Sequence, residues 1–328
     1  MKKGEAVSTN QISARKQTLK KLYSEHNVIL VTIIIFILAA IVESTNFLTL
    51  QNIINIIRNN AVVGVLAFGM SFVIISGNID LSIGSQVVAV GSIILWIMNS
   101  TGNMLLAIIV GLVCGCIFSA ITGIIITKGN VPSFVVTLGL MNIYRSVCMF
   151  FMSGGGFYGE VEMYSQISNY SLFDKIPLPI FYLAIIFAIY YYISKYTKTG
   201  RYIYAVGSNE KATRLSGINT DWVKIKAFIL MGAVVSVAAI IETSRMNSIN
   251  ASSSGISYEM NAIAMAVIGG ISMSGGKGSL VNTLFGIFIL GIINNILTLM
   301  GVDVFLVNAI RGCIIILAVL LQRTDKNS

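Results

Sequence analysis

Long apolar stretches separated by short polar segments dominate the pattern along the chain. A bilayer core about 30 Å thick is crossed by about 20 apolar residues in helical form. Ten stretches approach this length, and they cover residues 28–44, 53–76, 80–98, 104–127, 133–152, 178–194, 225–243, 260–273, 279–300 and 304–321. The pattern therefore predicts an all-α polytopic membrane protein with about ten transmembrane helices, some short or broken, and with eight or nine spans as the alternatives.

The polar segments divide the chain into regions. Residues 1–27 form a polar N-terminal segment, residues 28–321 form a single transmembrane domain, and residues 322–328 form a C-terminal tail. The longest polar interruption within the domain is the loop 195–226. The first apolar stretch follows a basic leader but lacks a clean small-x-small cleavage site, so we expect an uncleaved anchor.

Composition narrows the class of protein. Only 11% of the 328 residues are charged and 55% are hydrophobic, whereas a soluble domain carries roughly 25% charged residues. A soluble enzyme, a disordered regulator and a disulfide-stapled secreted domain are excluded on these grounds.

The positive charge predicts a topology. The net charge is +9, from 22 basic and 13 acidic residues. With the N-terminus inside, the ten spans place 17 basic residues on the cytoplasmic side, as the positive-inside rule requires. These residues are Lys2, Lys3, Arg15, Lys16, Lys20, Lys21, Lys128, Lys195, Lys198, Arg201, Lys211, Arg214, Lys224, Lys226, Lys277, Arg323 and Lys326. Both termini are therefore predicted to be cytoplasmic, and a nucleic-acid partner is not needed to explain the charge.

The sequence offers no suitable set of residues for a metal site or a disulfide bond. The four cysteines lie inside predicted spans without disulfide or zinc spacing, and His26 is the only histidine. The run SGGKGS at 274–279 departs from the phosphate-loop pattern because Gly278 follows Lys277. We interpret that run as a tight turn between two apolar segments.

Asp80 stands between two apolar segments, in the run SGNIDLSIGS at 76–85. It can cap the exposed amides at the start of the third span. It can also be an intramembrane carboxylate on a transport pathway or at a moving junction. The two interpretations are compatible.

Small and polar residues recur within the spans. Gly111, Gly115, Ser119 and Gly123 repeat every four residues, a stripe that lets a second helix pack closely. Charged and amide residues in spans face protein or water, or join helices. On this basis the candidates for a pathway are Asn59, Asn60, Asp80, Asn142, Arg145, Asn261, Asn294 and Asn295.

The loop 195–226 contains a predicted short helix. Ser208 or Asn209 can cap a helix that begins with Glu210, and Gly217 is placed to end it. A capped helix held outside a membrane bundle has the form of a docking element, and a solvated basic loop is the alternative.

Four motifs together resemble a known family. TKTGRYIYAVGSNEKATRLSGI, SGNIDLSIGS, NVPSFVVTLG at 130–139 and YEMNAIAMAVIGGISMSGGKGS at 258–279 resemble the membrane permease subunit of ribose/xylose/galactose-type ABC sugar importers, from about residue 28 to 321. Asp80, Glu210 and Gly217 match the family's pattern. Asn78, Ser208, Thr213 and the pair Met260–Asn261 depart from it, the usual residues being Gly, Gly, Ala and Leu-Asp.

The resemblance implies a type II-like ABC importer permease without catalytic activity or a bound cofactor. ATP and magnesium would bind to a separate cytoplasmic ATPase, a second copy of the permease would complete the pathway, and an extracytoplasmic binding protein would deliver a monosaccharide in a bacterial cell membrane. The resemblance further implies that the ATPase contacts the coupling helix, formed by Ser208, Asn209, Glu210, Lys211, Ala212, Thr213, Arg214, Leu215, Ser216 and Gly217.

Other functions remain open at this point. Relatives within the same class import nucleosides, a furanosyl signalling molecule or branched-chain amino acids. An ion-coupled secondary transporter would need a carboxylate or histidine relay in the spans, and a membrane enzyme would need a cluster of catalytic groups; the sequence offers little material for either.

Overall fold

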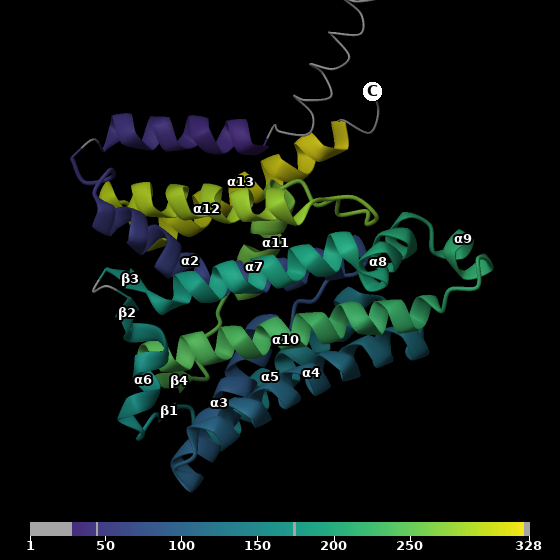
Figure 1. Cartoon of the computed structure of the whole chain (residues 1–328), viewed down its shortest axis with the longest axis horizontal. Coiled ribbons are helices and arrows are strands. Elements are labelled where there is room, and N and C mark those ends of the chain that lie inside the picture. Colours follow the sequence, from purple (N-terminus) through teal and green to yellow (C-terminus); the bar gives the residue numbers. More distant parts are fainter. Residues whose placement is uncertain (1–27, 44, 173–174, 325–328) are drawn as a thin grey trace, which may run out of the picture.

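The computed structural model describes residues 28–43, 45–172 and 175–324. The predictions for the basic leader and for His26 lie outside this part of the chain. Long helices run roughly parallel to one another, and the short elements gather at the two ends of the bundle (Figure 1). The helices α8 and α9 lie at one end, and α6 with the short strands lies at the other.

The first helix covers Val28–Val42, and the described residues after it form twelve further helices and four short strands. In chain order they are α2 (Leu50–Ile75), α3 (Ile83–Thr101), α4 (Met104–Gly129), α5 (Ser133–Phe151), β1 (Gly156–Tyr158), α6 (Glu162–Asn169), β2 (Ser171–Leu172), β3 (Ile176–Pro177), α7 (Leu178–Tyr196), α8 (Lys198–Ser208), α9 (Glu210–Leu215), α10 (Thr220–Met246), β4 (Ser248–Asn250), α11 (Tyr258–Ile268), α12 (Leu280–Leu299) and α13 (Val304–Thr324).

Each predicted apolar stretch coincides with a helix, which confirms the polytopic all-α architecture. Within the described residues, seven helices are long and apolar enough to cross a membrane: α2, α3, α4, α5, α7, α10 and α12. Three shorter apolar segments, Val28–Val42, Tyr258–Ile268 and Val304–Ile314, correspond to the first, eighth and tenth stretches. The eighth stretch was expected to be short, and α11 ends at Ile268.

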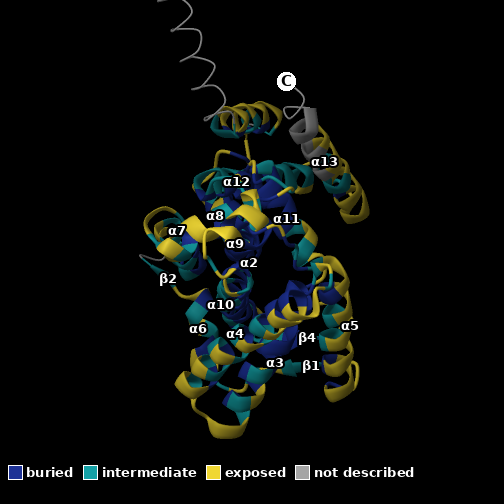
Figure 2. Ribbon diagram, turned by 90° about the vertical axis from the view of Figure 1, so that its right-hand side faces the viewer, coloured by how far each residue is buried: buried dark blue, intermediate teal, exposed yellow. Residues whose placement is uncertain are grey.

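Burial separates central helices from peripheral ones. In the most apolar 18-residue windows, 78% of α2 and 72% of α3 are buried, against 11% of α5 and 17% of α7. Figure 2 shows the same contrast, with buried ribbon inside the bundle and exposed residues along α5 and α13. The helices α2, α3 and α10 are therefore the core, and the outer helices present apolar side chains to the surroundings.

The stripe of small residues on α4 packs as predicted. A Cβ atom added to Gly115 would overlap Ser236 Oγ and lie 2.8 Å from the carbonyl oxygen of Gly232 on α10. Ser236 Oγ also donates to the carbonyl oxygen of Gly111 at 3.0 Å. Close backbone approach and an interhelical hydrogen bond together stabilise the α4–α10 pair.

Two antiparallel strand pairs close the end of the bundle opposite α9. The pair β1–β4 aligns Gly156 with Asn250 and Tyr158 with Ser248, and β2 pairs with β3. The chain after β4 then turns back into the bundle along α3. On α3, Gly91 faces Ile249, and a Cβ on Gly84 would overlap the carbonyl oxygen of Gly255. Gly84 and Gly91 are about 10 Å apart along α3, so the returning chain follows this helix over that length.

Candidate functional site

The helix α9 stands at the end of the bundle and is capped as the sequence predicts. Asn209 Oδ1 accepts a hydrogen bond from the backbone N–H of Ala212 at 3.0 Å. Gly217 ends the segment with a φ of +82°, a conformation that costs glycine no steric strain. Of the two candidate caps, Asn209 is the N-cap, and Ser208 is the last residue of α8.

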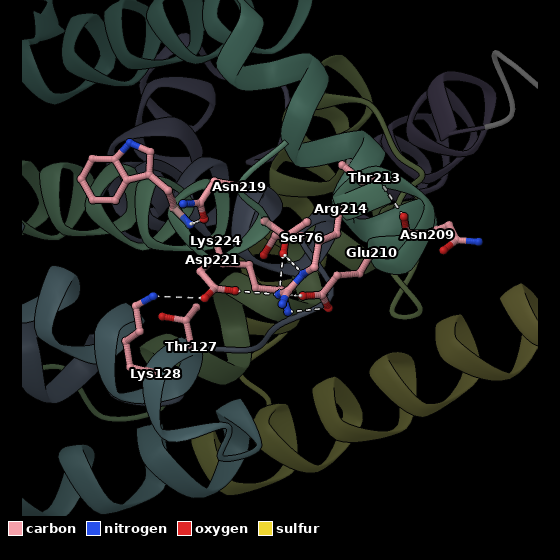
Figure 3. A network of polar contacts seen from close by, with 12 residues as sticks. Ser76, Thr127, Lys128, Asn209, Glu210, Thr213, Arg214, Asn219, Asp221 and Lys224 are labelled. Atoms are coloured by element: carbon pink, nitrogen blue, oxygen red, sulfur yellow. Dashed lines mark hydrogen bonds and ion pairs between the residues drawn. The ribbon is translucent and has the colours of Figure 1, made fainter. Parts of the chain in front are cut away.

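An ion-pair network fixes α9 to the helices behind it. Glu210 accepts from Lys224 Nζ at 2.7 Å and from Arg214 Nη2 at 3.4 Å. Arg214 Nη2 lies 2.8 Å from Asp221 Oδ1, and Asp221 Oδ2 lies 3.2 Å from Lys128 Nζ at the end of α4. Figure 3 shows these side chains converging from α9, α10 and α4.

The network orients α9 as well as holding it. Exposed ion pairs stabilise a fold by little, but this chain of pairs joins three helices, and Arg214 also donates to Thr220 Oγ1 at 2.7 Å. Thr213 is buried against the bundle, whereas Leu215 is 90% exposed. The α9 face turned away from the bundle is therefore free to contact another molecule.

A second connection runs through backbone atoms at the same end of the bundle. The N–H of Gly276 donates to the carbonyl oxygen of Ile75 at 2.9 Å. A Cβ on Gly207 would overlap that oxygen and lie 2.6 Å from Gly276 N. We call this contact of Ile75, Gly207 and Gly276 the glycine junction, because it joins the ends of α2 and α8 to the loop 269–279.

Tyr204 reinforces the glycine junction. Its hydroxyl donates to the carbonyl oxygen of Gly278 at 3.0 Å. Burial raises the pKa of the Tyr204 phenol, an effect opposed by a hydrogen bond with Ser194. The phenol therefore stays protonated and keeps its donor. The run 274–279 is a loop, as expected, and it is positioned by these contacts.

The linker 76–82, which follows the glycine junction, carries Asp80. Asp80 is fully buried, and its Oδ1 accepts from the N–H and Oγ of Ser82 at 2.9 and 2.5 Å. The predicted cap on the third span is wrong in detail, because the carboxylate bonds Ser82 before the helix begins at Ile83 and Ser82 is the N-cap. Asp80 Oδ2 has no hydrogen-bond partner in the described part of the chain, an arrangement that is costly for a buried carboxyl group.

Arg145 anchors the segment that turns back into the bundle. Its Nη1 donates to the carbonyl oxygens of Ala251 and Ser254 at 2.8 and 2.7 Å. The guanidinium group thus fixes the chain between β4 and α11 against α5. Arg145 is one of the pathway candidates, and these hydrogen bonds show that it positions the segment between β4 and α11.

The remaining pathway candidates form separate groups. Arg311 donates to Asn261 Oδ1 and Asn294 Oδ1, each at 3.0 Å. Asn295 exchanges two hydrogen bonds with Asn52, at 2.8 and 3.0 Å. Asn60 and Asn142 donate to the backbone of their own helices, and Asn59 is exposed. The structure does not bring these residues together at one site, and their place on a pathway stays a prediction.

Lys128, Asp221 and Asn52 are partners in these contacts that the sequence did not reveal. The Glu210–Arg214 spacing of four residues was a usable signal for the α9 network. No local pattern pointed to Lys128 or Asn52, because their partners are distant in the sequence.

Residues 52–319 match the family described as branched-chain amino acid transport system / permease component. The chain is 36% identical over 321 residues to the ribose import permease protein RbsC of Escherichia coli (strain K12), covering 96% of this chain and 99% of that protein. It is 39% identical over 292 residues to RbsC of Bacillus subtilis (strain 168), covering 88% and 90%.

A third relative is named for a different sugar. The L-arabinose transport system permease protein AraH of Escherichia coli (strain K12) is 30% identical over 320 residues, which cover 97% of each chain. No solved structure matches the chain. The family match spans most of the chain, and the helices described above fit a multi-pass permease. The chain belongs to the branched-chain amino acid transport system / permease component family.

Proposed function

We propose that this chain is the membrane-spanning permease subunit of an ATP-driven importer for a monosaccharide of the pentose or hexose class. The observation that carries the proposal is α9, a capped helix fixed by ion pairs on one face and exposed at Leu215 on the other. Relatives named as ribose and L-arabinose permeases support the substrate class.

Coupling to an ATPase proceeds through α9 by two routes. One route runs from Glu210 and Arg214 through Asp221 to α10 and α4. The other runs along α8 to the glycine junction, and from there to the linker that holds Asp80. Movement of the ATPase would displace both sets of helices, which is what alternating access of a pathway requires.

The chain supplies the pathway, and its partners supply the energy and the solute. ATP and magnesium bind to a separate ABC ATPase, an extracytoplasmic binding protein delivers the sugar, and a second permease copy completes the pathway. A neutral polyol needs hydrogen-bond donors and acceptors without a counter-charge. Amides in the spans, such as Asn60, Asn142 and Asn294, would supply such donors and acceptors.

The end of the bundle that carries α9 faces the cytoplasm of a bacterial cell. The segment 195–226 holds seven basic and two acidic residues, and such an excess marks cytoplasmic loops. The termini lie on this same side in the predicted topology.

Uptake into proteoliposomes tests the proposal and separates it from the alternatives. The chain is reconstituted with its partner ABC ATPase and binding protein, and labelled ribose, L-arabinose, a nucleoside and leucine are offered in turn. ATP-dependent uptake of a pentose is expected. Uptake of leucine or of the nucleoside alone would move the chain to another substrate class. Uptake by the chain alone under an ion gradient would refute the ATP-driven mechanism.

A further inference from the structure

A groove lies where α7 and α10 separate near the α9 end of the bundle. It has a volume of about 250 Å³ and is lined by Ile193, Thr197, Thr199, Lys226, Ile229 and Leu230. The hydroxyl of Tyr190 on α7 donates to the carbonyl oxygen of Leu230 on α10 and joins the two helices beside the groove. The first turn of α8, which contains Thr199, contributes the remaining side.

The groove changes from polar to apolar along the helices. Lys226 lies one and a half turns from the start of α10, and Ile229 and Leu230 lie about 5 Å farther along the helix. Ile193 provides an apolar wall on α7, whose end carries Thr197 as the N-cap of α8. An occupant must therefore have a polar head and an apolar body in this orientation.

The aromatic residues near the groove place it at the membrane interface. Lys226 Nζ lies 5.6 Å from the ring centroid of Trp222. Tyr192 and Tyr196 are exposed at the end of α7, with 61% and 58% of their surface accessible. Exposed Trp and Tyr with flanking lysine are typical of the level of lipid headgroups.

Charge at the groove selects the headgroup. The two carboxylates of the segment 195–226, Glu210 and Asp221, are paired with Arg214, Lys224 and Lys128. Lys226 has no carboxylate partner in the part of the chain that the structure describes, and it extends over the Trp222 ring at the mouth of the groove. The free charge at this site is therefore positive.

We infer that the groove binds an anionic glycerophospholipid of the adjacent leaflet. Its phosphate would lie at Lys226 with Thr199 as a hydrogen-bond donor, and one acyl chain would pack against Ile193, Ile229 and Leu230. A basic pocket between transmembrane helices is a recognised form of headgroup site. A protein partner is disfavoured because the apolar walls lie within the membrane-spanning helices α7 and α10. The inference depends on the membrane location of the chain and is independent of the transported solute.

Native mass spectrometry of the purified chain tests this site with phosphatidylglycerol and phosphatidylcholine as probes. The wild type should retain phosphatidylglycerol in preference to phosphatidylcholine. Lys226→Gln should weaken phosphatidylglycerol binding about fivefold, as expected for one basic residue at a charged surface. Lys226→Arg should restore it, and Lys211→Gln, which removes an equal charge on exposed α9, should leave it unchanged.

The acyl-chain part of the site has its own variant. Ile229→Trp fills the groove and should lower the retention of both lipids while Lys226 stays in place. Circular dichroism and gel filtration identify folded variants, and Lys226→Arg covers the case in which the glutamine variant does not fold. Equal losses in Lys226→Gln and Lys211→Gln would show general surface attraction and overturn the inference. Displacement of phosphatidylglycerol by equimolar inorganic phosphate would show a free-anion site and would also overturn it.

Discussion

The glycine junction gives the sharpest prediction about coupling. Gly207→Ala adds one methyl group where backbone atoms surround it, 2.6 Å from Gly276 N and overlapping the carbonyl oxygen of Ile75. No side chain can rotate away to relieve the contact. Because non-bonded heavy atoms pack at about 3.5–4.0 Å, the end of α8 must move by about 1 Å from Gly276 N and by about 2 Å from the carbonyl oxygen of Ile75 at the end of α2.

The cost of this movement can be worked out from the contacts. Overpacking of this kind costs about 1–3 kcal/mol. Loss of the hydrogen bond from Gly276 to Ile75 costs about 1 kcal/mol more. Alanine regains up to about 1 kcal/mol of helix propensity. The free energy of unfolding should therefore fall by about 1–4 kcal/mol.

The assay combines stability with coupling. Equilibrium unfolding in mixed micelles gives the free energy, and proteoliposomes with the ATPase and binding protein give the solute transported per ATP hydrolysed. Gly207→Ala should lower both quantities. Gly139→Ala is the matched control, because a Cβ on that α5 residue meets no atom within 4 Å. Wild-type stability and coupling in Gly207→Ala would refute the reasoning.

Three further variants test other contacts. Glu210→Lys should lower the solute transported per ATP because the new lysine repels Lys224 and Arg214. Adding Lys224→Glu should recover part of that transport, and no recovery would show that the Glu210–Lys224 pair does not position α9. In a double-mutant unfolding cycle, Asn52→Ala and Asn295→Ala should show an interaction energy of about 0.6–1.7 kcal/mol, which is typical of interhelical hydrogen bonds in membranes. Additive losses of unfolding free energy would rule out the amide pair. Arg145→Gln should speed amide hydrogen exchange in the segment 251–257, because it removes the two hydrogen bonds to Ala251 and Ser254. The control Arg58→Gln should not change this exchange, and identical exchange rates in both variants would contradict the anchoring contact.

The helices could be predicted because a membrane span requires a continuous apolar run. The stripe on α4 and the cap at Asn209 could also be predicted, because each depends on residues that are only three or four positions apart. The helix α8 was missed because its sequence is polar overall and contains Gly200 and Gly207. Its buried residues Gly200, Ile203 and Val206 repeat every three positions, a signal that could have found it.

The candidate pathway could not be assembled from the sequence. Which way an amide points depends on how its helix is rotated, and that rotation is set by packing against distant helices. Asn295 meets Asn52 across more than 240 positions of sequence. Asp80 was recognised as unusual, and its bond to the N–H of Ser82 is the local turn that aspartate favours two residues on. Its complete burial, however, depends on packing between distant helices, which no local pattern determines.

Cross-linking from α9 tests the proposed ATPase contact most directly. A photoreactive amino acid replaces Leu215, which is 90% exposed on α9, or Tyr158, which is 72% exposed at the opposite end of the bundle. Each variant is expressed in membranes together with the ATPase and the binding protein, and the products are identified by mass. Position 215 should cross-link to the ATPase, and position 158 should not. A cross-link to the ATPase from position 158, or none from position 215, would contradict the assignment of α9 as the coupling helix.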